Sequence, residues 1–258
     1  MRAALVIFLT VLGACAGVAR APATAAPGAA PSLEAVVVIS ANAEWKVVRA
    51  TFPDVRVAPT PWGESFERTI GGERVVFFHG GWGKIAAAGS AQYAIDRWHP
   101  RTLVNLGTCG GFAGRIARHA VVLVTRTVVY DIKESMGDSA EAIADYAVDL
   151  DLSWLPPAAH PSAVERTLLV SADRDLVPAE IGELATRYGA VAGDWESGAI
   201  AYTAKRNRQR VLILRGVSDL VSDVGGEAIG NPDAFVEGTR VVMTRLLSEL
   251  PAWLAACP

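Results

Sequence analysis

Residues 211–219 read VLILRGVSD, an apolar run that ends in a serine and an aspartate. Short apolar runs alternate with segments of helical periodicity from Leu33 to the end of the chain. This alternation is typical of α/β proteins, in which helices pack on a central sheet. We therefore expect one α/β domain of three layers, in which helices flank both faces of a central mixed sheet.

The same periodicity predicts where the individual elements lie. The expected strands are residues 36–39, 103–106, 120–129, 168–170 and 211–217, a hairpin over 66–78 that turns at Gly71-Gly72, and a short strand centred on Val191. The expected helices are residues 44–51, 84–98, 178–188, 196–205 and 233–250. Residues 131–161 are polar, acidic and contain proline, which predicts an irregular or partly helical loop.

Composition excludes several classes of protein. The 258 residues include 24 Lys and Arg against 27 Asp and Glu, a net charge of −3, and 51% of them are hydrophobic. Such a chain buries too much apolar surface to be intrinsically disordered. Its acidic balance gives no electrostatic basis for binding nucleic acid, so we expect no nucleic-acid partner.

The N-terminus has the pattern of an export signal. Arg2 precedes the apolar run 3–14, which is shorter than the roughly 20 residues of a membrane-spanning helix. The run ends in LGAC at residues 12–15, which resembles the lipobox of bacterial lipoproteins and implies that Cys15 is lipidated. Ordinary signal-peptidase cleavage is the alternative, although Pro22 disfavours the nearest such site.

An Ala- and Pro-rich stretch follows, with the composition of a flexible tether. We therefore expect a signal peptide over 1–15, a tether over 16–32 and a folded domain over 33–258. The protein is expected in the periplasm, with contact to the membrane only through a lipid on Cys15.

The remaining cysteines, Cys109 and Cys257, are expected to be free thiols. No cysteine has the spacing of a metal ligand, and the histidines are scattered singly along the chain. We therefore expect neither a metal site nor a cofactor.

Polar side chains follow four of the expected strands. Residues 40–44 and 194–196 carry carboxylates at helix starts, and Ser218-Asp219 follows the apolar run 211–217. Residues 107–111 read GTCGG, which predicts a glycine turn whose N–H groups could hold an anion or a hydroxyl. Ligands of such sheets bind beyond the carboxyl ends of the strands, so one site is expected to collect these groups.

Four segments in order resemble the nucleoside phosphorylase/nucleosidase superfamily. They are residues 80–88 (GGWGKIAAA), 104–111 (VNLGTCGG), 194–201 (DWESGAIA) and 217–219 (VSD). The resemblance extends from about Val36 to Leu250 and is closest to the methylthioadenosine/S-adenosylhomocysteine nucleosidases. It implies a nucleoside phosphorylase-like fold, a purine nucleoside as the small-molecule substrate, hydrolysis of its N-glycosidic bond, and a homodimer.

The resemblance also implies roles for single residues. Asp219 would be the general acid that protonates the departing purine, steadied by Ser218, and Glu196 would hold the ribose hydroxyls. Glu44 would orient the attacking water; an alternative alignment places Trp45 there, but only Glu44 has suitable chemistry. Further substrate contacts are implied for Trp195, Thr108, Cys109, Gly110, Asp175 and Leu176.

Each of these residues also has a structural interpretation. Asp219 and Ser218 could cap a turn, and Glu44 and Glu196 could stabilise helix N-termini. Residues 107–111 could be only a tight turn. Trp195 could belong to the core as well as to a pocket wall.

Departures from the family pattern bear on the substrate and the reaction. The base-stacking aromatic is missing near Asp175, and Trp195 stands where the nucleosidases have methionine. Phosphorylases carry a basic residue before the glycine turn, where this chain has residues 104–106 (VNL), which favours hydrolysis. A phosphorylase using Arg49, Arg68 or Arg215 remains an alternative, as does a non-catalytic nucleoside-binding lipoprotein.

Overall fold

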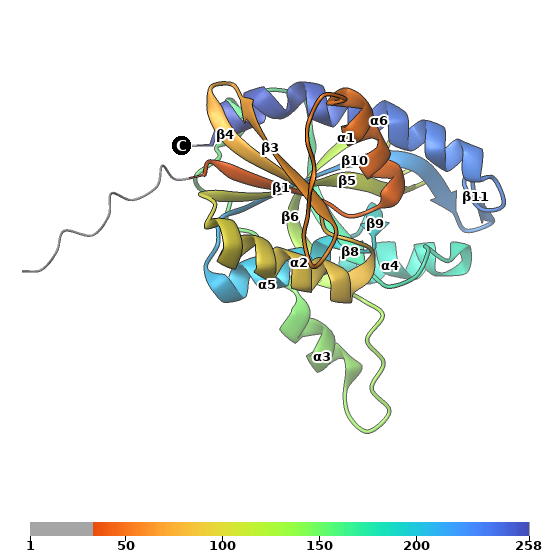
Figure 1. Ribbon diagram of the computed structural model, residues 1–258. Helices are drawn as coiled ribbons and strands as arrows, with labels where there is room; N and C mark the ends of the chain where they lie inside the picture. The colour runs from red at the N-terminus through yellow and green to blue at the C-terminus, as the bar shows by residue number, and fades with distance from the viewer. Residues whose placement is uncertain (1–32, 258) are drawn as a thin grey trace, which may run out of the picture. The chain divides into compact units, whose positions relative to one another are not determined.

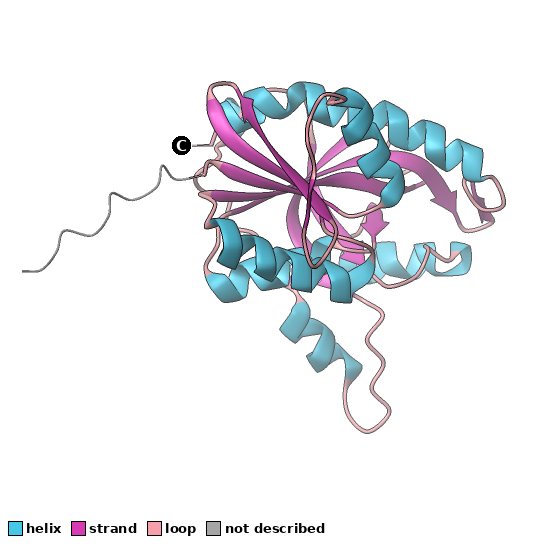
Figure 2. Ribbon diagram, viewed as in Figure 1, coloured by secondary structure: helices cyan, strands magenta, loops and turns pink. Residues whose placement is uncertain are grey.

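The computed structural model describes residues 33–257, which form a mixed sheet of eleven strands and six α-helices (Figures 1 and 2). The strands are β1 (Ala35–Ile39), β2 (Ala58–Pro59), β3 (Glu64–Ile70), β4 (Glu73–His79), β5 (Thr102–Phe112), β6 (Val121–Val129), β7 (Val148–Asp149), β8 (Glu165–Ser171), β9 (Ala192–Asp194), β10 (Val211–Ser222) and β11 (Gly225–Gly226). The helices are α1 (Asn42–Thr51), α2 (Gly83–Trp98), α3 (Ser139–Tyr146), α4 (Ile181–Tyr188), α5 (Ser197–Asn207) and α6 (Pro232–Ala255). Short 3₁₀ turns, η1 (Pro157–Ala159) and η2 (Pro178–Glu180), complete the set.

The sheet lies between two layers of helices, as the periodicity predicts. Helices α1 and α6 cover one face, and α2 and α5 cover the other (Figure 1). Strand β1 shows why both faces are covered, because all five of its residues are buried. Val36 and Val38 join the core under α2 and α5, while Val37 and Ile39 join the core under α1 and α6.

The sheet also closes on itself on one side. Strand β10 pairs in parallel with β5 and antiparallel with β6, and β6 leads through β8 and β9 back to β5. Strands distant in sequence therefore meet around β5. This closure brings the ends of β5, β9 and β10 together.

The prediction of a glycine turn at residues 107–111 is wrong. Residues 107–111 continue β5, and their partner β10 continues through Ser218 and Asp219 instead of ending at Val217. Glycine is needed at position 107 for packing, since a Cβ there would lie 1.9 Å from Nη1 of Arg215. A contact between two strands so far apart in sequence leaves no local signal.

The other boundaries differ little from the prediction. Val191 directly precedes β9 instead of centring it, and β8 is longer than residues 168–170. Helix α6 continues beyond Leu250 through Pro251. Residues 131–161 are mostly irregular and contain α3, as expected.

The predicted signal peptide, the tether and the lipidation site Cys15 lie outside the described residues. Within residues 33–257, no helix combines the length and the apolar character needed to cross a membrane.

Candidate active site

The Glu44 carboxylate connects helix α1 to strand β5. Its Oε1 accepts hydrogen bonds from the backbone N–H of Thr108 at 2.6 Å and from the Thr108 hydroxyl at 2.9 Å. Its Oε2 accepts from the backbone N–H of Ala41 at 3.1 Å, so Glu44 also caps its own helix. The N–H groups of residues 107–111 therefore form no anion cradle: the segment is a strand, and a carboxylate already takes the N–H of Thr108.

Trp45, the alternative to Glu44, belongs to the hydrophobic core. Its ring stacks on His79 with centroids 5.3 Å apart, and its indole N–H donates to Glu64. Glu44 is thus the residue that faces the other acids.

Arg215 is the centre of the charged cluster. Its guanidinium is fully buried and lies 2.8 Å from Asp194, 3.8 Å from Glu44 and 3.9 Å from Glu196. Burial disfavours the charged form, but the three carboxylates outweigh it and raise the pKa of Arg215. Nε donates to the Ser197 hydroxyl at 2.9 Å.

This role of Arg215 and Asp194 is absent from the sequence prediction. The available signal was an arginine inside a strand that is otherwise apolar. Such a residue requires buried counter-charges.

Glu196 follows strand β9 and is the N-cap residue of helix α5, yet its side chain makes no capping hydrogen bond to that helix. Oε1 instead accepts from the backbone N–H of Gly83 at 3.1 Å, where α2 starts. Burial raises the pKa of Glu196 to about 8; Asp194 and Glu44 add to the rise, while Arg215 and the Gly83 N–H oppose it. Glu196 therefore holds a proton at neutral pH more readily than an exposed glutamate does.

Ser218 and Asp219 lie at a bulge in β10. Val217 pairs with Cys109 and Asp219 with Gly110, so Ser218 is the extra residue. The Ser218 hydroxyl donates to Asp219 Oδ1 at 2.6 Å. Burial raises the pKa of Asp219 even though the Ser218 hydrogen bond lowers it, and the nearby Glu227 and Asp175 carboxylates add to the rise. The site thus contains a carboxyl group that retains its proton to a higher pH than an exposed aspartate does.

The remaining predicted residues follow β5 toward Asp219. The buried Cys109 thiol is free and within electrostatic range of Asp194, Arg215, Asp219 and Glu44, and burial raises its pKa. Gly110 pairs with both β9 and β10, and a Cβ on it would lie 2.9 Å from the Leu176 side chain. The exposed Asp175 carboxylate is close enough to Asp219 to raise its pKa.

Trp195 lies outside the hydrophobic cores. Its partly buried ring stacks on that of Trp82, with centroids 6.3 Å apart, and Trp82 is 64% exposed. The interpretation of Trp195 as a core residue is therefore wrong. Next to it along the chain, Glu196 contacts Gly83, so the two tryptophans flank the charged cluster.

Fold and site together define a class of protein. A family model described as the phosphorylase superfamily matches residues 35–250. The chain belongs to this superfamily, which confirms the resemblance drawn from its four motifs.

Several proteins that this chain resembles are nucleosidases. The chain is 29% identical over 191 residues to a 5′-methylthioadenosine/S-adenosylhomocysteine nucleosidase of Maridesulfovibrio salexigens, covering 69% of this chain and 83% of the relative. A nucleosidase of the same name from Marinomonas is 25% identical over 213 residues, covering 77% and 88%. The fold is similar to that of the Streptococcus pyogenes S-adenosylhomocysteine nucleosidase in complex with 5-methylthiotubericidin, with a TM-score of 0.72, 17% identity and coverage of 90% and 100%.

Proposed function

We propose that this chain hydrolyses the N-glycosidic bond of a purine nucleoside of the methylthioadenosine or S-adenosylhomocysteine type. The products are the free base and the sugar. The curated relatives described above are named for this class of nucleoside. The observation that carries the proposal is the convergence of three buried acids, Glu44, Glu196 and Asp219, around β5.

Each acid has an environment suited to one part of the reaction. Breaking the bond builds negative charge on the purine, and Asp219, with its raised pKa, supplies a proton to it. Positive charge develops on the ribosyl carbon, and the Glu44 carboxylate orients the water that attacks there. Glu196 binds the ribose hydroxyls beside the start of α2. The base leaves protonated, the hydroxyl of the water remains on the sugar, and the other proton of the water passes to the Glu44 carboxylate. Exchange with solvent then returns a proton to Asp219.

The charge of the cluster favours water over phosphate as the nucleophile. Arg215 is shared among Asp194, Glu44 and Glu196, so it has no free face for a phosphate dianion. Arg49 pairs with Glu64 at 3.8 Å, and Arg68 lies over the ring of Phe52. Acids in excess around one guanidinium would repel phosphate.

A binding protein without catalysis would gain nothing from a buried acid that keeps its proton. Asp219 and its Ser218 partner therefore favour an enzyme. The positions of Asp175 and Trp195 differ from the family pattern, so a panel of nucleosides is needed to find the preferred substrate.

The test is to incubate the purified protein with methylthioadenosine, adenosine and inosine, with and without phosphate. Free base and reducing sugar should appear in equal amounts at the same rate in both buffers. Strict dependence on phosphate, with a sugar 1-phosphate as product, would instead identify a phosphorylase. Saturable nucleoside binding without turnover of any substrate would identify a binding protein.

We also propose that the protein is exported to the periplasm and anchored by a lipid on Cys15, as residues 12–15 (LGAC) suggest. Replacing Cys15 with serine should move the protein from the membrane fraction to the soluble fraction and leave its activity intact. Identical fractionation of both proteins as soluble species would rule out the lipid.

A homodimer is the proposed assembly, on the basis of the resemblance. The exposed side chains of Trp82 and Ile85, 64% and 83% accessible, agree with a covered surface at the start of α2. Light scattering on the purified protein should give twice the mass of the chain, and a monomeric mass would contradict the proposal.

A further inference from the structure

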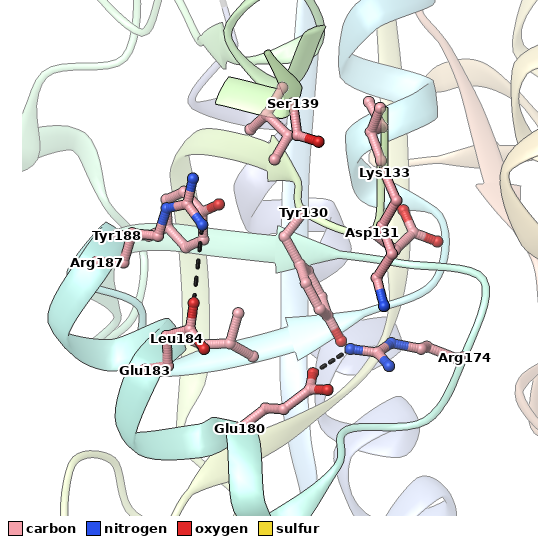
Figure 3. A pocket seen from close by; sticks show the side chains of 12 residues that line it. Tyr130, Asp131, Lys133, Ser139, Arg174, Glu180, Glu183, Leu184, Arg187 and Tyr188 are labelled. Atoms are coloured by element: carbon pink, nitrogen blue, oxygen red, sulfur yellow. Dashed lines mark hydrogen bonds and ion pairs between the residues drawn. The ribbon is translucent and has the colours of Figure 1, made fainter. Parts of the chain in front are cut away.

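A cavity lies between the loop after β6, helix α3 and helix α4 (Figure 3). Its volume is about 280 Å³. Ile132, Ile143 and Leu184 give it an apolar wall, and Tyr130, Lys133 and Arg174 supply polar groups. Glu44, Glu196 and Asp219 are not among its lining residues.

The cavity contains buried hydrogen-bond donors without partners. Tyr130 is only 9% exposed; the Arg174 guanidinium lies beside its buried hydroxyl and can only donate to it, so the O–H itself has no acceptor among the described residues. Nε of Arg174 is buried and equally without a partner in residues 33–257. The guanidinium of Arg174 lies over the Tyr130 ring, 5.4 Å from its centroid. Buried polar groups are almost always satisfied, so these two donors point to something that the cavity takes up.

The acids around the cavity are already engaged. Asp131 accepts from the Lys84 ammonium and, at 3.0 Å, from the backbone N–H of Asp173. Ion pairs join Glu180 to Arg174 and Glu183 to Arg187. Figure 3 shows both ion pairs at the cavity wall.

Lys133, by contrast, makes no ion pair with any residue that the structure describes. In Figure 3 its side chain points toward the end of the cavity where Tyr130 and Arg174 meet. The unused groups of the cavity are thus donors, and two of them, the Lys133 ammonium and Nε of Arg174, belong to positively charged side chains.

We propose that this cavity binds a small organic acid. Its carboxylate accepts from the Tyr130 hydroxyl and Nε of Arg174 and faces the Lys133 ammonium. Its apolar body lies against Ile132, Ile143 and Leu184. The volume is close to the lower end of the range for small-molecule sites, about 300 Å³, and suits a compact acid.

Benzoate is a suitable probe, because it combines a carboxylate with a small apolar ring. It should be titrated by calorimetry into the full protein, into Tyr130→Phe, which removes only the hydroxyl, and into Lys133→Met at an exposed position. Tyr146→Phe is the matched control, since the Tyr146 ring packs on Tyr202 and does not line the cavity. Benzamide keeps the ring of benzoate but has no charge, and inorganic phosphate is an anion without a ring. The two probes therefore separate the contribution of the charge from that of the ring.

Saturable 1:1 binding of benzoate is expected, weakened on the order of tenfold in Tyr130→Phe and in Lys133→Met, and unchanged in Tyr146→Phe. Benzamide and phosphate should bind more weakly than benzoate. The proposal is overturned if no binding saturates, which would mean that water fills the cavity. It is also overturned if binding ignores both substitutions, or if phosphate binds at least as tightly as benzoate.

Discussion

At the scale of single residues, the charged cluster depends on Arg215. Three carboxylates approach one buried guanidinium, and two of them, Glu44 and Glu196, carry proposed roles in the reaction. A buried ion pair contributes little compared with apolar packing, but removing one partner leaves a buried charge without compensation. Arg215 therefore holds the acids in place more than it strengthens the fold by itself.

Replacing Arg215 with methionine should lower the free energy of unfolding by about 3–5 kcal/mol, because Asp194 and Glu44 lose their counter-charge. Denaturant-induced unfolding measures the change. Arg240→Met is the control, since Arg240 is exposed and pairs with the exposed Glu237 on α6, and its midpoint should not move. Equal midpoints for Arg215→Met and the wild type would contradict the shared ion pair.

Glu196 should make stability depend on pH. The folded protein holds the Glu196 proton until about pH 8, while the unfolded chain releases it near pH 4.5. The folded state therefore binds more protons in this interval, so the free energy of unfolding falls as pH rises from 4.5 to about 8.

Glu196→Gln has no titrating group at this position, so it should not lose stability through residue 196 as the pH rises. Its free energy of unfolding should therefore increase relative to that of the wild type between pH 4.5 and about 8. Thermal melting of both proteins at several pH values measures the difference. Asp219, whose pKa is also raised, is present in both proteins, so its contribution to the pH dependence cancels in the comparison. Parallel melting curves would show that Glu196 ionises normally in the folded protein.

At the scale of elements, the bulge in β10 sets the position of the proposed acid. Ser218 is the extra residue, and helix α6 packs directly behind it. A Cβ on Gly238 would lie 2.1 Å from the Ser218 carbonyl oxygen, so only glycine allows this approach. The helix thus supports the bulge by direct contact with the backbone of Ser218.

Gly238→Ala should push β10 away from α6, displace Asp219 and lower turnover by more than tenfold, with a loss of stability of about 1–3 kcal/mol. Gly182→Ala in α4 is the matched control, because nothing lies within 4 Å of a Cβ there. That change should be neutral or stabilising by up to ~1 kcal/mol. Steady-state rates and melting temperatures of the two variants measure these effects. Full activity of Gly238→Ala would contradict the claim that the contact between α6 and Ser218 positions Asp219.

The sequence predicts elements better than it predicts how they join. Buried runs such as residues 35–39 have a local signature, so most strands and helices are recovered within a few residues. The two-residue strands β2, β7 and β11 are too short for such a signature and are not predicted. The extension of β5 through residues 107–111 is missed, because the glycines there leave space for the side chains of Arg215 and Leu176. Those side chains come from distant segments of the chain, so the local sequence does not reveal the reason for the glycines. The bulge at Ser218 is missed for the same reason.

At the scale of the whole molecule, closure of the sheet between β5 and β10 gathers the site. It places Asp219 opposite Gly110, while Glu44 reaches the same strand at Thr108. Asp219 was predictable because it follows the apolar run 211–217, although β10 continues past it to Ser222. Glu44 and Glu196 were predictable because they follow strand ends at helix starts. Their common counter-ion was not, since the sequence alone does not show which buried carboxylates an arginine will meet.

The most direct test of the account is the turnover of Asp219→Asn on methylthioadenosine, compared with the wild type. Asparagine keeps the size of the side chain but cannot donate the proton, so turnover should fall by about 10²–10⁴-fold while the melting temperature stays close to that of the wild type. A nucleoside whose leaving group departs unprotonated should lose much less. Turnover of methylthioadenosine near the wild-type rate would contradict the assignment of Asp219 as the general acid.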